Sequence, residues 1–297
     1  MSQTTAPRQA ALLILAGMAT LGLSDNFVAY VSADSSLWQF HLVRGGMVLA
    51  VMGMIAALGF GVIRPKRPLA VLARSGIQAM SMLIYFGCLA ILPIGVVVAG
   101  LFTAPLFVAL IAVGFQGKRI GRVHTTAILL GFAGALMVIR PDPANFDLVA
   151  FLPILAGLLY AIGAVATRAW CEGEATLALS AGFFVVLTVM GAVGCLVLPS
   201  VGTGADGFAI RGWMPLDAGL IFWIAMQAVG ALLGIMCLFR GYQIGEASKV
   251  AVFEYSLLVF ASGWAWYLWG QTVPLLGLFG MALIVLSGAV IALRRDA

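Results

Sequence analysis

The chain has 297 residues, of which 63% are hydrophobic and only 9% are charged, and its mean hydropathy is +1.12. A soluble protein carries about 25% charged residues, so this composition excludes a water-soluble globular enzyme. The excess of 16 Lys and Arg over 11 Asp and Glu would suggest nucleic acid for a soluble protein. In so apolar a chain it indicates cytoplasmic loops that face anionic lipids, and no nucleic-acid partner is expected.

Apolar runs bounded by polar, Gly or Pro residues predict an all-α integral membrane protein with ten transmembrane helices. A bilayer core about 30 Å thick needs about 20 apolar residues per helix, so ten helices use roughly 200 residues and leave no room for a soluble domain. The expected spans are residues 10–30, 37–62, 69–91, 94–115, 122–140, 148–169, 177–199, 217–239, 247–269 and 273–293. Pro105 alone falls deep inside a span and predicts a kink, either for packing or to line a cavity.

The basic residues predict the orientation in the membrane. With ten spans, only Arg140 and Arg211 fall on the outer side, and Arg44 lies within a helix. The positive-inside rule therefore predicts that both termini lie in the cytoplasm. The membrane is expected to be a bacterial inner membrane. The basic residues expected on the cytoplasmic side are Arg8, Arg64, Lys66, Arg67, Arg74, Lys118, Arg119, Arg122, Arg168, Arg240, Lys249, Arg294 and Arg295.

An internal repeat divides the chain into two halves. Residues 85–140 match residues 239–294 at a constant offset of 154, so that Gly87 meets Gly241 and Gly134 meets Gly288. Near the start of each half, residues 14–17 recur as residues 154–157. The halves are expected at 1–145 and 146–297 with five helices each, and the odd number inverts the second half in the membrane. Inverted repeats with a site at the midplane are an architecture of secondary transporters.

Several short motifs along the chain point to a known family: residues 92–95, Pro105-Leu106-Phe107, Gly131-Phe132-Ala133-Gly134, Val252-Phe253-Glu254-Tyr255, Gly277 and Gly288. Through these motifs the chain resembles the EamA-type members of the drug/metabolite transporter superfamily over most of its length. That resemblance implies ten helices, a central cavity between the halves and transport of a small metabolite. In the family an acidic residue often ends helices four and nine, whereas Lys118 and Gln271 lie near those positions here.

Few strongly charged residues lie well inside the spans, and each is therefore informative, since a charge at the bilayer centre costs about 2.5–3.5 kcal/mol on insertion scales. They are Asp25, Arg44 and Glu254. In one interpretation an Asp25–Arg44 pair locks helices one and two together. In the other, Asp25 or Glu254 faces a wet cavity and binds substrate or a proton. Because the repeat partner of Glu254 is Gly100, packing needs no charge there, which favours a functional Glu254.

Polar and aromatic residues at helical spacing complete the expected substrate site. Carboxylates beside aromatic faces suit an ammonium group, and Arg44 or His41 suits a substrate carboxylate, so we expect an amine or a zwitterion. Gln227 is open between a helix–helix hydrogen bond and a ligand contact. The candidate substrate-binding residues are Asp25, Asn26, His41, Arg44, Gln78, Tyr85, Trp223, Gln227, Glu254, Tyr255 and Trp264, with Asp25 and Glu254 as candidates for coupling.

These features favour a secondary transporter over two alternatives. A channel-like or structural membrane protein is the second hypothesis, although no filter motif is visible. An intramembrane enzyme would need a Ser/His dyad, an HExxH motif or an aspartate pair, and none is present in the sequence. Four scattered Cys and two His without CxxC spacing predict free thiols and neither metal nor cofactor. The expected partners are a small-molecule substrate and the bilayer, with protons and a homodimer left open.

The expected topology can be tested by cysteine labelling in a cysteine-free background. A single cysteine placed between Thr203 and Asp206 should react with an impermeant reagent added outside the cell, and one placed at Lys66 should not. Labelling at position 66 alone would reverse the predicted orientation.

Overall fold

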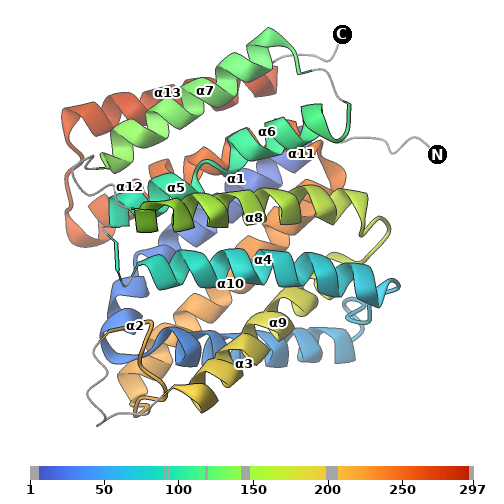
Figure 1. Cartoon of the computed structure of the whole chain (residues 1–297), viewed down its shortest axis with the longest axis vertical. Helices are drawn as coiled ribbons and strands as arrows, with labels where there is room; N and C mark the ends of the chain where they lie inside the picture. Colours follow the sequence, from blue (N-terminus) through green and yellow to red (C-terminus); the bar gives the residue numbers. More distant parts are fainter. Residues whose placement is uncertain are drawn as a thin grey trace.

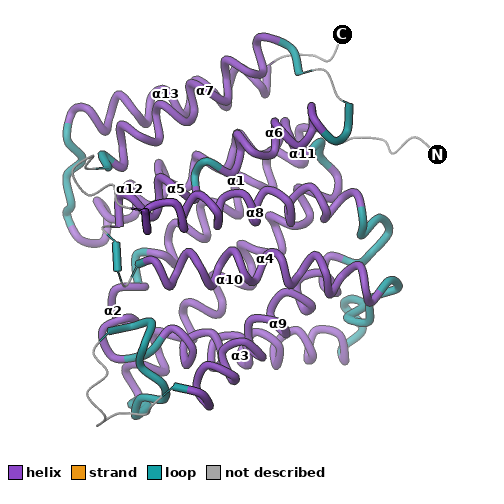
Figure 2. The backbone as a smooth tube through the Cα atoms, in the orientation of Figure 1, coloured by secondary structure: helices purple, strands orange, loops and turns teal. Residues whose placement is uncertain are grey.

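In the computed structural model, helices follow one another along almost the whole chain (Figure 2), and the structure describes residues 7–89, 91–92, 94–117, 120–141, 148–198 and 207–293. Lys118, Arg119, Arg294, Arg295 and the labelling segment 203–206 therefore lie outside the described residues. The helices are α1 (Pro7–Asp25), α2 (Val28–Asp34), α3 (Leu37–Ala57), α4 (Pro68–Cys88), α5 (Ile94–Leu101), α6 (Ala104–Gly114), α7 (Arg122–Ile139), α8 (Phe151–Ala169), α9 (Thr176–Val197), α10 (Ala218–Ile244), α11 (Ala247–Val250), α12 (Ser256–Trp269) and α13 (Leu275–Leu293), with 3-10 helices η2 (Leu148–Ala150) and η3 (Ala251–Tyr255).

The fold class is an all-helical membrane protein. Eight described helices are long and apolar enough to cross a bilayer, and Gly95–Gly114 counts as one of them. The part of the chain that the structure describes contains no strand. The first and ninth predicted spans correspond to α1 and α12, which are not among these eight. The prediction of ten spans is therefore confirmed only for eight.

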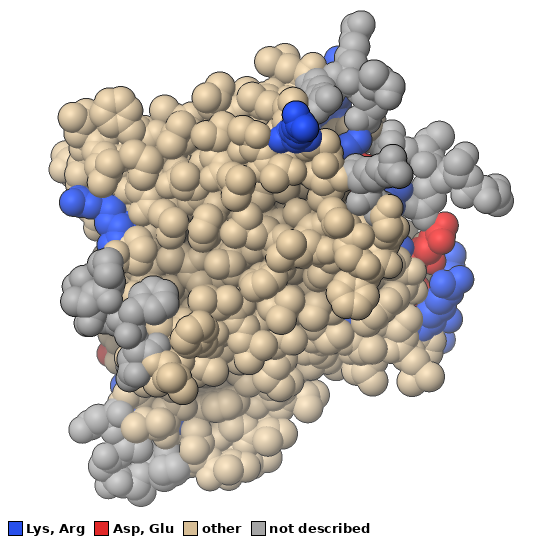
Figure 3. Space-filling view, turned by 45° about the horizontal axis from the view of Figure 1, so that its top comes forward, with Lys and Arg blue, Asp and Glu red and all other residues tan. Residues whose placement is uncertain are grey.

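The surface has the charge distribution of a membrane-spanning bundle. The helices run broadly in one direction across Figure 1, so that their ends gather on two opposite sides of the molecule. On the face shown in Figure 3, Lys, Arg, Asp and Glu lie at these two sides, and a broad uncharged surface separates them. Such a surface suits a hydrocarbon layer between two aqueous phases.

Three predicted spans are interrupted at positions that matter for the site. The first span was expected to continue to residue 30, but α1 ends at Asp25 because Asn26 turns back and its side-chain amide donates to the Gly22 carbonyl at 2.7 Å. The fourth span breaks between α5 and α6, where Pro105 stands in the first turn of α6, which confirms the predicted kink. The ninth span begins as α11 and passes through η3 before α12, so Glu254 lies in a 3-10 turn.

Helices from distant parts of the chain pack in pairs. The closest pairs are α1 with α10, α4 with α8, α3 with α9, and α7 with α13. In Figure 1, α7 and α13 lie together at the top, whereas α3 and α9 lie at the bottom. Each pair joins a helix of residues 1–145 to one of residues 146–297, so the two segments interlock along their whole length.

Small residues allow α1 and α10 to approach closely. A Cβ added to Gly17 would lie 2.9 Å from the carbonyl oxygen of Gly234, which is too close for an unstrained contact. On the same face of α10, a Cβ at Gly230 would meet the side chain of Ser24. The small-xxx-small spacing of Gly230 and Gly234 therefore serves helix packing, as its sequence pattern predicts.

Replacing Gly17 with Val should destabilise the protein by about 1–3 kcal/mol, because the added side chain meets backbone that cannot move aside. The apparent melting temperature in detergent should fall clearly. Gly53→Val is the matched control, since Gly53 is also helical and a Cβ there meets nothing within 4 Å. Equal melting temperatures for the two variants would contradict the close α1–α10 contact.

Candidate functional site

A cavity of about 330 Å³ lies between the two segments. Most of its wall is apolar and includes Phe86, Phe102, Phe183 and Phe184. Six of the predicted site residues line it, namely Asp25, Asn26, Arg44, Tyr85, Gln227 and Glu254, and they come from both segments. Pro105 also lines the cavity, so the helix-four break shapes the cavity wall.

Glu254 sits in a cradle of two tyrosines. The hydroxyl of Tyr242, on α10, donates a hydrogen bond to the Glu254 carboxylate, and the hydroxyl of Tyr160, on α8, is a second partner. The Glu254 side chain is only 7% exposed, yet it reaches the cavity wall. Hydrogen bonds to an ionised group are about twice as strong as neutral ones, so the cradle holds this carboxylate in one orientation.

The end of α1 brings a second carboxylate to the same cavity. Asp25 is the last residue of α1, and its exposed side chain lines the cavity. Asn26 next to it donates to the Ala261 carbonyl of α12 at 3.1 Å. Gln227 of α10 donates to the Ser24 carbonyl, so it makes the predicted helix–helix hydrogen bond and lines the cavity as well. These bonds fix Asp25 at the point where α1, α10 and α12 meet.

Arg44 enters the cavity from α3 with aromatic support. Its guanidinium lies 4.3 Å from the ring centroid of Phe40, and a terminal nitrogen lies 3.3 Å from Nδ1 of His41. The charges of Asp25 and Arg44 interact through space. No ion pair within 4.0 Å joins the two among the described residues. The interpretation in which this pair locks helices one and two is therefore not supported by a direct contact.

The other predicted residues lie away from the cavity wall. His41 supports Arg44 from behind, and Gln78 is buried on α4. Trp223 stacks on Phe27 and on Tyr30, with ring centroids 5.2 and 4.8 Å apart, near the end of α1. Tyr255 stacks on Phe102 and is fully buried, and Trp264 donates to the Ala19 carbonyl at 3.1 Å. In this structure the last three serve packing rather than the cavity surface.

Three buried residues were not among the predicted site residues, namely Tyr160 and Tyr242 beside Glu254, and Arg74 on α4. Tyr160 and Tyr242 stand in apolar helices without a polar neighbour that would single them out, although a phenol in a membrane helix usually seeks a partner. Arg74 is expected on the cytoplasmic side from the distribution of basic residues, and in the structure it lies in the second turn of α4 and is fully buried. Its signal was present, since four residues separate Arg74 from Gln78 and place both on one helical face.

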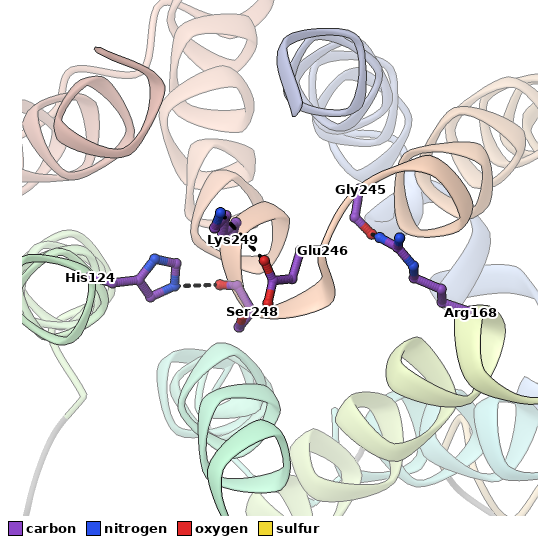
Figure 4. Close-up of polar contacts among 6 residues, drawn as sticks. All are labelled: His124, Arg168, Gly245, Glu246, Ser248 and Lys249. Carbon is purple, nitrogen blue, oxygen red and sulfur yellow. Dashed lines mark hydrogen bonds and ion pairs between the residues drawn. The ribbon is translucent and has the colours of Figure 1, made fainter. Parts of the chain in front are cut away.

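The chain segment that leads into η3 is fastened at the predicted cytoplasmic end. Figure 4 shows Arg168 of α8 reaching the Gly245 carbonyl, at 2.6 Å, and His124 of α7 reaching the Ser248 carbonyl, at 2.8 Å. Lys249 and Glu246 pair within the same turn at 3.4 Å. These contacts tie the α10–α11 turn to two neighbouring helices, a few residues before Glu254.

Comparison with known proteins supports a membrane transporter. The chain is 26% identical over 269 residues to a riboflavin transporter of Rhizobium johnstonii, which covers 91% of this chain and 83% of that protein. It is 26% identical over 288 residues to the pseudopaline exporter CntI of Pseudomonas aeruginosa, covering 96% and 95% of the two chains. No family model matches. A solved crystal structure shares the fold, with a TM-score of 0.73 at 19% identity and 96% of each chain covered.

The α10–α11 contacts predict a measurable effect of Arg168. Arg168→Gln removes a hydrogen bond from a charged donor, worth about 1.5–3 kcal/mol, and should loosen the predicted cytoplasmic end. A single cysteine at Ala231, on the cavity wall, should then react on the order of tenfold faster with a reagent on that side. Arg122→Gln, at an exposed basic residue of α7, is the control and should leave the rate unchanged. An unchanged rate for Arg168→Gln would show that this bond does not hold the turn.

Proposed function

We propose that the chain is a secondary transporter that moves an amine or a zwitterion through the cavity by alternating access. The observation that carries this proposal is Glu254, a carboxylate held by two tyrosines on the wall of a cavity between the two segments. A carboxylate in that position attracts a cation, and the aromatic wall supports an ammonium group. At about 330 Å³ the cavity is at the small end of ligand sites, which favours a ligand the size of an amino acid.

The packing pattern supports an inverted repeat of five plus five helices. An inverted repeat relates helix one to helix six, helix two to helix seven, and so on to helix five and helix ten. Under this exchange the pair α1–α10 becomes the pair α8–α4, whereas the pairs α3–α9 and α7–α13 are each unchanged. Two of the three interrupted spans, those broken at α5–α6 and at η3, are also exchanged. A symmetric pair of arrangements, one open to each side, is the basis of alternating access in such folds. The similarity to EamA-type transporters agrees with this architecture.

The two cavity carboxylates also provide a way to couple substrate transport to proton movement. Glu254 and Asp25 can each hold a proton when no cation is bound, so a proton and a cationic substrate compete for the same groups. Competition of this kind allows exchange of one for the other across the membrane. The predicted orientation, with both termini in the cytoplasm of a bacterial cell, sets the two sides between which the substrate moves.

The first experiment identifies a ligand and then tests Glu254. A thermal-shift screen of purified protein against amino acids, amines, nucleosides and vitamins should yield amine-containing compounds that raise the melting temperature. In proteoliposomes, Glu254→Gln should then lower counterflow of such a compound roughly ten- to hundredfold, because a charge-assisted contact is lost. Its melting temperature without ligand should stay near that of the parent, since Gln is nearly isosteric.

Two controls show whether the effect is specific to Glu254 and to the amine of the ligand. Asp34→Asn changes an exposed carboxylate that lines neither the cavity nor the second pocket, and this variant should transport normally. Acetylation of the ligand's amine should weaken its binding to the parent protein. Glu254→Gln should reduce the difference in affinity between the free amine and the acetylated ligand. Normal counterflow by a well-folded Glu254→Gln variant, or equal affinity of the parent for both forms, would contradict the proposal.

A further inference from the structure

A stripe of polar residues runs along α4 toward the cavity. Arg74, Gln78, Ser81 and Tyr85 are spaced by four, three and four residues, which places them on one face of the helix. This face meets α8, where Arg74 Nε donates to the Thr167 hydroxyl at 2.9 Å and Ser81 donates to the Ala156 carbonyl at 2.7 Å. Tyr85, at the far end of the stripe, lines the cavity. The stripe thus leads from the cavity to Arg74.

Arg74 is buried with part of its hydrogen-bonding capacity unused. Its side chain is 0% exposed, and its guanidinium lies 3.6 Å from the ring centroid of Phe239. Neither terminal nitrogen has a hydrogen-bond partner within the described part of the chain. Gln78 Oε1, one turn away, has none there either. Buried polar groups in proteins are nearly always paired, so these atoms indicate a ligand, or water, that arrives when the helices move.

Arg74 stands in the partition between the central cavity and a second pocket. The second pocket, of about 380 Å³, lies at the predicted cytoplasmic end. On α8, Tyr160 lines the cavity and Thr167 lines the second pocket; on α10, Leu238 lines the cavity and Arg240 lines the second pocket. Arg74 donates to Thr167, on the wall of the second pocket, and lies against Phe239, which follows the cavity residue Leu238 on α10. Along α8 the lining residues of the two spaces are seven positions apart, or roughly 10 Å, whereas along α10 they are two positions apart, or roughly 3 Å.

We propose that Arg74 binds the carboxylate of the substrate as it passes from the central cavity to the cytoplasmic pocket. This inference rests on the proposed transport function and adds to it that the substrate carries an acid group as well as an amine. A guanidinium presents a planar fork of donors that matches a carboxylate, and the two unpaired nitrogens of Arg74 form that fork. Glu254 takes the cationic end on the cavity side, and Tyr160 lies within electrostatic reach of both Glu254 and Arg74.

The acidic side chains of this region, Glu174 and Glu172, leave the guanidinium of Arg74 available to a carboxylate ligand. Glu174 already accepts hydrogen bonds from the backbone amides of Lys66 and Arg67, at 2.9 and 2.5 Å. Glu172 lines the second pocket but is exposed to solvent.

A cysteine introduced at Ile244, a partly exposed residue on the wall of the second pocket, provides a test that needs no known substrate. The protein carries Ile244→Cys as its sole cysteine, with Cys88, Cys171, Cys195 and Cys237 changed to Ala, in inside-out membrane vesicles. Two methanethiosulfonate reagents, sulfonatoethyl (anionic) and trimethylammonioethyl (cationic), are compared by rate. The anionic reagent should react about fivefold faster or more, and Arg74→Gln should abolish this preference. Arg122→Gln is the control and should change this preference little, because Arg122 is exposed on α7, lies outside the second pocket and has a screened charge.

Sodium propionate then tests carboxylate binding directly. It should slow the anionic reagent in the parent, relative to sodium chloride at equal ionic strength and to propionamide. Arg74→Lys, which keeps the charge but loses the fork, should retain the reagent preference and lose most of the protection, so the test stands even if Arg74→Gln does not fold. Equal reaction rates of the two reagents in the parent, no reaction of the cysteine at position 244 with either reagent, or equal protection by propionate in Arg74→Lys would overturn the proposal. Counterflow of amines is measured separately, so failure of transport is distinguishable from failure of anion binding.

Discussion

The structure depends on the requirement that a charge within the membrane must have a partner or reach water. Glu254 meets it through the hydroxyls of Tyr242 and Tyr160 and through the cavity, and Asp25 meets it by facing the cavity. Arg44 meets it through aromatic rings and His41. Because these groups come from α1, α3 and η3, the same cavity has to be bordered by all three elements. The break in each of the helices that carry Asp25 and Glu254 follows from this, since it leaves the side chain at a turn beside the cavity.

The two halves of the chain are alike in packing and unlike in chemistry. Gly100 is the repeat partner of Glu254, and it packs so closely against Pro153 that it leaves no room for a side chain. The half that lacks the carboxylate therefore supplies close helix contact, whereas the other half supplies the carboxylate and its cradle. In the proposed function, this single carboxylate between two similarly packed halves is the substrate-binding group that both sides of the membrane reach in turn.

Much of the fold follows from the sequence, because apolar runs and their boundaries depend on local composition. The kink at Pro105 and the small-residue contact at Gly230 and Gly234 were predictable for the same reason. Six of the predicted site residues line the cavity, but Trp264 and Tyr255 do not, since helical spacing does not tell which face a residue turns inward. Tyr160 and Arg74 were missed because their importance arises from neighbours far away in the chain. The end of α1 at Asp25 depends likewise on a bond from Asn26 to α12.

The account's central claim is that Glu254 and Asp25 bind the positive end of a small molecule in one shared cavity. An experimental structure with an amine compound bound tests it most directly. The account predicts ligand density in the cavity, with the ammonium group within hydrogen-bonding or ion-pair distance, about 2.7–4 Å, of the Glu254 or Asp25 carboxylate. Density on the outer surface of the bundle, or an ammonium group turned toward Arg44 with both carboxylates unoccupied, would contradict it.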